Sequence, residues 1–140
     1  MRKPPPLDKQ SGVMLLEALI AILIFSFGIL GIVGLQGTAV KQATDARFRS
    51  EASFLANQLL GTMRMGDTTV ANMQTKYNTG NTEYMNWKGS VEDALPGVTA
   101  NPPTVVVDAQ GIVTITIQWL APNEPAGSAA HRYVAIAQIK

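Results

Sequence analysis

The chain has 140 residues, a net charge of +1 and no cysteine. This length accommodates one modest folded domain beside a membrane anchor. The small net charge and the lack of a basic stripe argue against a nucleic-acid-binding protein. The absence of cysteine excludes disulfides, thiol catalysis and cysteine-ligated metal sites.

Residues 1–12 form a short polar N-terminal segment that contains a proline run and ends in Gly12. A secretory signal peptide also has a basic stretch before an apolar one, but its apolar core is usually about 7–15 residues long. The apolar stretch that follows here is longer. A small-residue pattern at Gly37-Thr38-Ala39 keeps conventional cleavage after Ala39 as an alternative.

Residues 13–35 are apolar except for Glu17 and Ser26. As a helix they would extend roughly 34 Å, which is enough to cross a hydrocarbon core of about 30 Å. A single segment in lipid must be helical, because it cannot close a barrel. We therefore expect one membrane-spanning helix.

The orientation of this helix does not follow from charge alone. Cationic residues lie on both sides of it: Arg2, Lys3, Lys9, Lys41, Arg47 and Arg49. Long trailing domains cross the membrane largely regardless of charge. We expect the N-terminus in the cytoplasm, with the rest of the chain on the far side of the membrane.

Glu17 is the one ionisable side chain within residues 13–35. One interpretation is an interfacial acid that reaches water near the positive end of the helix dipole. The other applies if the chain is cut before Val13. The new α-amino group would lie about 6 Å from Glu17 along the axis. Amine and acid could then pair between staggered helices in a bundle.

The string KQSGVMLLEALIAILIFSFGILG, at residues 9–31, resembles the leader and the start of a type IV prepilin. The resemblance implies cleavage after Gly12 by a prepilin peptidase and N-methylation of Val13. It places Glu17 at the fifth mature position, where the family has a glutamate. Val13 departs from the family, which more often has Phe or Met at the first mature position.

The strings FGILGIVGLQ and SEASFLANQLLGTMR more narrowly resemble PilV-type minor pilins, also called type IV pilus modification proteins. This resemblance implies a structural subunit that supports pilus assembly, adhesion or twitching motility. The implied location is the inner membrane, with a periplasmic head, and then the pilus. The implied partners are the major pilin, other minor pilins and the inner-membrane assembly platform. Minor pseudopilins of type II secretion systems share the N-terminal pattern and remain an alternative.

Four glycines recur at every third position: Gly28, Gly31, Gly34 and Gly37. They spiral around the helix and do not form a GxxxG seam, which argues against a simple two-helix dimer. They favour either close approach to several neighbouring helices or a segment that loses helical hydrogen bonds during assembly. Ordinary membrane-helix glycine also remains open.

Residues 36–65 continue the helix in a water-compatible form. Ala39, Ala43 and Ala46 lie on one face and suit contact with other helices. The opposite face has a stripe that is predicted to dock onto a sheet. This stripe comprises Phe48, Ala52, Leu55, Leu59 and Met63. The helix should end near Gly66-Asp67.

Residues 66–140 are predicted to form a small α+β head. Turn formers predict an exposed irregular loop over residues 67–90. In that loop Tyr77 and Tyr84 are candidates for contact with a partner or surface, while Trp87 is expected to be buried. A very short helix should begin at Ser90-Val91-Glu92-Asp93 and stop at Pro96-Gly97.

The second half of the head is predicted to form strands near 104–108, 112–119 and 132–139. A hairpin loop at Ala109-Gln110-Gly111 joins the first two, with Gly111 able to adopt positive φ. The predicted architecture is pilin-like. It has a long N-terminal helix whose upper half packs on an antiparallel sheet of about three or more strands.

No enzyme, cofactor or metal site is expected from the sequence. Ser128, His131 and Asp108 lack the elbow and oxyanion elements of a hydrolase, and His131 reads as a solvated or edge residue. Calcium at Asp67 or in the 78–83 loop stays open. A signal-anchored periplasmic binding domain or enzyme that never polymerises is a third alternative.

Overall fold

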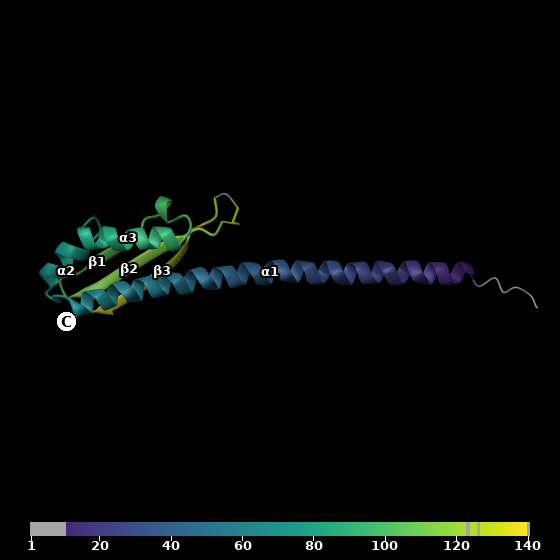
Figure 1. Ribbon diagram of the computed structural model, residues 1–140, viewed down its shortest axis with the longest axis horizontal. Helices are drawn as coiled ribbons and strands as arrows, with labels where there is room; N and C mark the ends of the chain where they lie inside the picture. Colours follow the sequence, from purple (N-terminus) through teal and green to yellow (C-terminus); the bar gives the residue numbers. More distant parts are fainter. Residues whose placement is uncertain (1–10, 123, 126, 140) are drawn as a thin grey trace, which may run out of the picture. The chain divides into compact units, whose positions relative to one another are not determined.

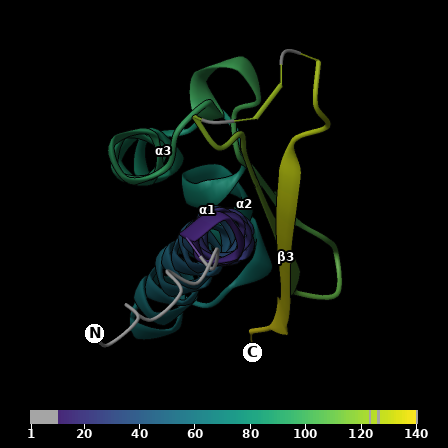
Figure 2. The same cartoon turned by 90° about the vertical axis from the view of Figure 1, so that its right-hand side faces the viewer.

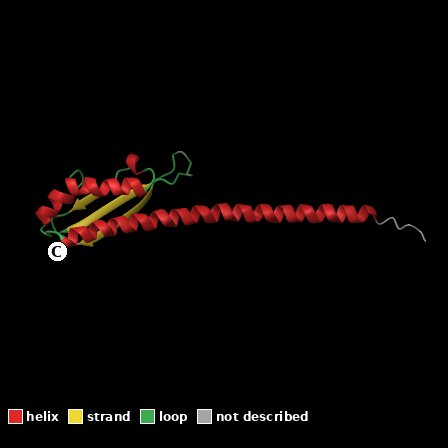
Figure 3. Ribbon diagram, viewed as in Figure 1, coloured by secondary structure: helices red, strands yellow, loops and turns green. Residues whose placement is uncertain are grey.

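The computed structural model describes residues 11–122, 124–125 and 127–139, so most of the predicted leader lies outside the described residues. Contacts divide the chain into two units, residues 1–42 and 43–140. Figures 1 and 3 show the elements in chain order. These are α1 (Ser11–Met65), α2 (Val70–Tyr77), α3 (Thr82–Ala94), the 3-10 turn η1 (Val98–Ala100), β1 (Thr104–Val107), β2 (Ile112–Trp119) and β3 (His131–Gln138).

The three strands form one antiparallel sheet in the order β1-β2-β3, with β2 in the centre. Their bounds match the predicted strands to within one residue at each end. Side chains of β2 alternate between a buried face and a more open one. The buried face comprises Val113, Ile115, Ile117 and Trp119. The α+β prediction of a long helix with a small antiparallel sheet is confirmed.

The helices of the head lie over this buried face of the sheet (Figure 2). The predicted stripe on α1 is confirmed, because four of its members are buried and Phe48 packs against them. Ala56 and Leu60 are buried as well, so the stripe is wider than predicted. The helix ends at Met65, next to the predicted stop.

The β1–β2 hairpin explains the role of Asp108. One of its carboxylate oxygens, Oδ1, accepts hydrogen bonds from the backbone N–H groups of Gln110 and Ile112, each at 2.8 Å. Gly111 has φ +76°, and a Cβ there would lie 2.8 Å from the carbonyl oxygen of Ile139. The predicted turn is confirmed, and Asp108 stabilises this turn.

The prediction of an exposed loop over residues 67–90 is wrong. Two helices, α2 and α3, occupy most of this segment. The predicted short helix starting at Ser90 is also wrong, because residues 90–93 lie in the C-terminal half of α3, whose N-cap is Asn81. Trp87 is buried as expected, and its indole N–H donates to the carbonyl of Leu55 at 3.0 Å.

Polar residues between α2 and α3 form hydrogen bonds with the backbone groups on the free edge of β1. The Thr79 hydroxyl oxygen accepts from the Val105 N–H at 3.1 Å, and the Asn78 side-chain oxygen accepts from the Val107 N–H at 3.0 Å. The Thr79 N–H donates to the Val105 carbonyl at 3.3 Å. An unpaired strand edge is a template for unwanted pairing. The polar residues of this segment therefore protect the edge of the sheet.

The loop prediction placed Tyr77 and Tyr84 at the surface, but both side chains are buried. They are only 7% and 3% exposed, respectively. The Tyr84 hydroxyl donates to the carbonyl of Pro103 at 2.6 Å. Burial raises the pKa of both phenols above the usual 10.0, and the charge of Glu83 raises the pKa of Tyr77 further.

Tyr84→Phe should lower the free energy of unfolding by about 1–2 kcal/mol, because the Pro103 carbonyl loses its buried partner. It should also reduce the pH dependence above pH 10.0. The unfolded tyrosine ionises there while the buried one stays neutral, so wild-type stability falls as pH rises through the raised pKa. Urea unfolding at neutral and alkaline pH measures both effects. An unchanged alkaline slope in the variant would contradict this account.

Candidate functional site

The N-terminal unit presents an uncovered apolar helix. Its large apolar side chains over residues 13–35 are between 45% exposed, at Ile29, and 71% exposed, at Leu35. The helix is long and apolar enough to cross a membrane. An apolar surface of this extent needs lipid or other protein to cover it.

Two polar side chains of this helix satisfy their hydrogen bonds locally. The Ser26 hydroxyl donates to the carbonyl of Ile22 at 2.7 Å, and the Thr38 hydroxyl donates to that of Gly34 at 3.0 Å. Such bonds let hydroxyl groups enter lipid without an exposed donor. An ionised Glu17 cannot bond to a carbonyl of its own helix in this way, because a carboxylate accepts hydrogen bonds and has no proton to donate.

Glu17 lies on an otherwise apolar helix face. The residues that line a shallow groove along this face are Val13, Leu16, Glu17, Ile20, Ala21 and Ile24. Val13 and Glu17 are one turn apart on it, as the i, i+4 spacing requires. The Gly12–Val13 peptide bond is in the first turn of α1, where backbone N–H groups have no helical partner. A cut there would place a cationic amine on the same face as the acid.

The four glycines do not interrupt α1, which is helical from Ser11 to Met65. A Cβ at Gly28, Gly31, Gly34 or Gly37 would meet no atom within 4 Å other than the adjacent residues and the nearby backbone of its own helix. Nothing in this chain's own described packing therefore requires glycine at these positions. Two interpretations of the glycines therefore remain specific to assembly. One is close approach to several neighbouring helices, and the other is a segment that loses helical hydrogen bonds during assembly.

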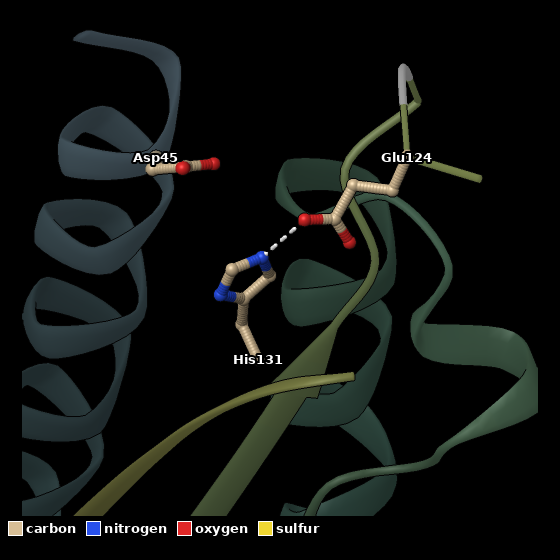
Figure 4. A group of neighbouring side chains, drawn as sticks. All are labelled: Asp45, Glu124 and His131. Atoms are coloured by element: carbon tan, nitrogen blue, oxygen red, sulfur yellow. Dashed lines mark hydrogen bonds and ion pairs between the residues drawn. The ribbon is translucent and has the colours of Figure 1, made fainter. Parts of the chain in front are cut away.

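The head brings together three residues that sequence analysis did not connect. Asp45 on α1, Glu124 in the β2–β3 loop and His131 at the start of β3 converge, with one ligand atom of each within 4.8 Å of the others (Figure 4). His131 Nε2 lies 2.7 Å from Glu124 Oε1. The ring of His131 stacks on Trp119, with centroids 5.6 Å apart. His131 lies at the start of the edge strand β3, so its interpretation as an edge residue holds, but it is partly buried and partnered, so its interpretation as a solvated residue is wrong.

No spacing signal links these residues, because Asp45 lies far from Glu124 and His131 in the sequence. Asp108 binds the Ile112 N–H at one end of β2, whereas His131 pairs with Trp119 at the other end, so the triad of Ser128, His131 and Asp108 considered from sequence does not form. Asp67 is fully exposed and accepts a hydrogen bond from the Thr69 N–H at 2.9 Å. This bond lowers the pKa of Asp67. Among the described residues, Asp67 is not in a cluster of three possible metal ligands.

Comparison with known proteins returns no match: no family model, curated protein or solved structure resembles the chain closely enough to count. The functional interpretation therefore rests on the chain's own chemistry and on the resemblance of its N-terminal sequence to prepilins. Two features stand out in it. They are the acid on the uncovered apolar helix and the cluster of two carboxylates and a histidine in the head.

Proposed function

We propose that this protein is a minor subunit of a type IV pilus, made as a prepilin and matured by cleavage between Gly12 and Val13. The observation that carries the proposal is Glu17, an acid on an uncovered apolar helix and the fifth residue after the proposed cleavage point. The α+β head on the C-terminal part of the same helix agrees with the architecture that the resemblance implies. No catalytic chemistry is part of this function.

The mechanism is assembly. The apolar helix stores the subunit in the inner membrane, with the N-terminus cytoplasmic and the head periplasmic. Entry into a helical bundle then exchanges lipid contacts for helix contacts. In the bundle the methylated amine of Val13 in one subunit neutralises Glu17 of a neighbour. A buried charge is costly unless it is paired, so this pairing favours the register in which amine and acid meet.

Glycine positions on the same helix fit a bundle. Small residues let helix backbones approach closely, and packing contributes much of the association energy in lipid. The partners would be the major pilin, other minor pilins and the assembly platform. A minor pseudopilin of a type II secretion system would use the same N-terminal chemistry. Co-purification with sheared pili, and not with secretion-system components, separates the two.

Gly12→Val should block maturation. A branched side chain before the scissile bond fills the space that the peptidase has for glycine, so the chain should remain heavier by residues 1–12. The measurement is an immunoblot of membranes and of sheared filaments. We expect only the heavier band in membranes and at least tenfold less protein in filaments.

Gly34→Val is the matched control, because it makes the same change in the same helix away from the cut. Its maturation should be normal. Normal leader removal in Gly12→Val would contradict the proposed cleavage point. A mature chain that begins at Val40 would instead favour conventional removal after Ala39.

A further inference from the structure

We propose that Asp45, Glu124 and His131 bind one Zn²⁺ ion, which ties the β2–β3 loop to α1 in the head. The three side chains come from a helix, a loop and a strand, and their ligand atoms lie within 4.8 Å of one another. Tetrahedral zinc with N and O ligands at about 2.0–2.2 Å has ligand atoms about 3.4 Å apart. Small side-chain rotations would close the cluster around the ion.

Two oxygen atoms in the cluster need a partner. Asp45 Oδ1 and Glu124 Oε2 are both buried, and neither has a hydrogen-bond partner among the residues that the structure describes. The Glu124 side chain is only 9% exposed, so water does not readily satisfy it. Unsatisfied buried oxygens are rare in folded proteins and call for an explanation. Figure 4 shows the Asp45 carboxylate directed toward Glu124 and His131, where a shared cation would lie.

The two carboxylates of the cluster also lack a compensating lysine or arginine among the described residues. Among the described residues, neither Asp45 nor Glu124 lies within ion-pair distance of a lysine or arginine. Protonated His131 would neutralise one of the two carboxylates and leave the other. A divalent cation with a neutral imidazole would neutralise both. The local charge therefore favours a metal ion over a proton.

The ligand types favour zinc among divalent cations. Calcium and magnesium take oxygen ligands, whereas an imidazole nitrogen with carboxylates suits zinc. Trp119 is 1% exposed and stacks on the imidazole with an interplanar angle of 16°, which holds the ring in place. The His131 side chain is 29% exposed, so an ion can enter from solvent. Three protein ligands leave a fourth position for water.

The test uses the full chain in detergent micelles, without a polyhistidine tag, after treatment with EDTA. Titration with ZnCl₂ should show about one ion bound per chain and raise Tm by about 4 °C or more. Asp45→Asn, Glu124→Gln and His131→Gln should each weaken binding at least tenfold. Asp93→Asn, an exposed acid on α3, is the control and should bind as the wild type does.

A second readout does not depend on how the variants fold. His131 is the only histidine, so its modification by diethylpyrocarbonate can be followed on a single peptide. Zinc should slow that modification at least tenfold. The proposal is overturned by an absence of saturable zinc binding, or by equal modification rates with and without zinc. It is also overturned if Asp45→Asn raises the Tm of the metal-free protein and leaves zinc binding intact, because the cluster would then be a proton-shared pair.

Discussion

Glu17→Ala should remove the protein from pilus filaments while leaving it in the membrane. In the filament, Glu17 would be paired with the Val13 amine of a neighbour, away from water. Removal of one partner of a buried pair typically costs about 3–5 kcal/mol, because the other charge is left uncompensated. Each 1.4 kcal/mol of free energy changes an equilibrium constant about tenfold. We therefore expect at least tenfold less of the variant in sheared filaments.

Membrane insertion should be normal or improved, because a carboxylate in a membrane helix is costly to insert. Glu17→Gln keeps the shape of the side chain and removes the charge, so it should fail in the same way if pairing is responsible. Ser26→Ala is the control, since its hydroxyl is satisfied within its own helix. Quantitative immunoblots of membrane and filament fractions measure the result. Normal incorporation of both Glu17 variants would rule out the pairing.

Ile115→Ala should have the largest effect on the stability of the head. Ile115 is fully buried on the central strand and lies opposite Val105 on β1 and Ala135 on β3. Truncation of a buried isoleucine to alanine costs about 2–5 kcal/mol, from lost burial and the cavity that remains. A head of this size is marginally stable, so such a loss would leave a substantial fraction unfolded.

Ile136→Ala is the matched control, because the same side chain on β3 is 69% exposed. Its effect should be within about 1 kcal/mol, chiefly from reduced strand propensity. Both tryptophans, Trp87 and Trp119, lie in the head, so urea unfolding followed by their fluorescence reports the head alone. Similar losses in the two variants would contradict the assigned buried face of the sheet.

Strong periodic signals made the long helix and the strands predictable. Residues 112–119 alternate between apolar and polar side chains, and Gly111 supplies the positive φ that the hairpin needs. The apolar run at 13–35 is long enough to cross a membrane, and a single segment in lipid must be helical. Each of these signals depends on residues that are close in sequence.

The α2–α3 segment was missed because its polar residues have a tertiary role. Tyr84, Trp87 and Val91 have helical spacing and are all buried, yet the surrounding Asn, Thr and Gly residues resemble a loop. Asn78 and Thr79 pair with the edge of β1, a partner that lies far away in the sequence. Local composition does not report such long-range hydrogen bonds.

The head cluster was missed for a related reason. Asp45 reads as an ordinary polar residue on an amphipathic helix, and Glu124 lies in a segment rich in Pro and Gly. Only the packing of α1, the β2–β3 loop and β3 brings the two acids to His131. By contrast, Gly12, Val13 and Glu17 form a pattern within one helical turn and a half, which is visible in the sequence itself.

The mass of the mature N-terminal peptide from the native protein tests the central claim most directly. The account predicts a chain that begins at Val13 and carries a methyl group on its α-amine, as the partner of Glu17. A native chain that retains Met1, or one that begins at Val40, would contradict it.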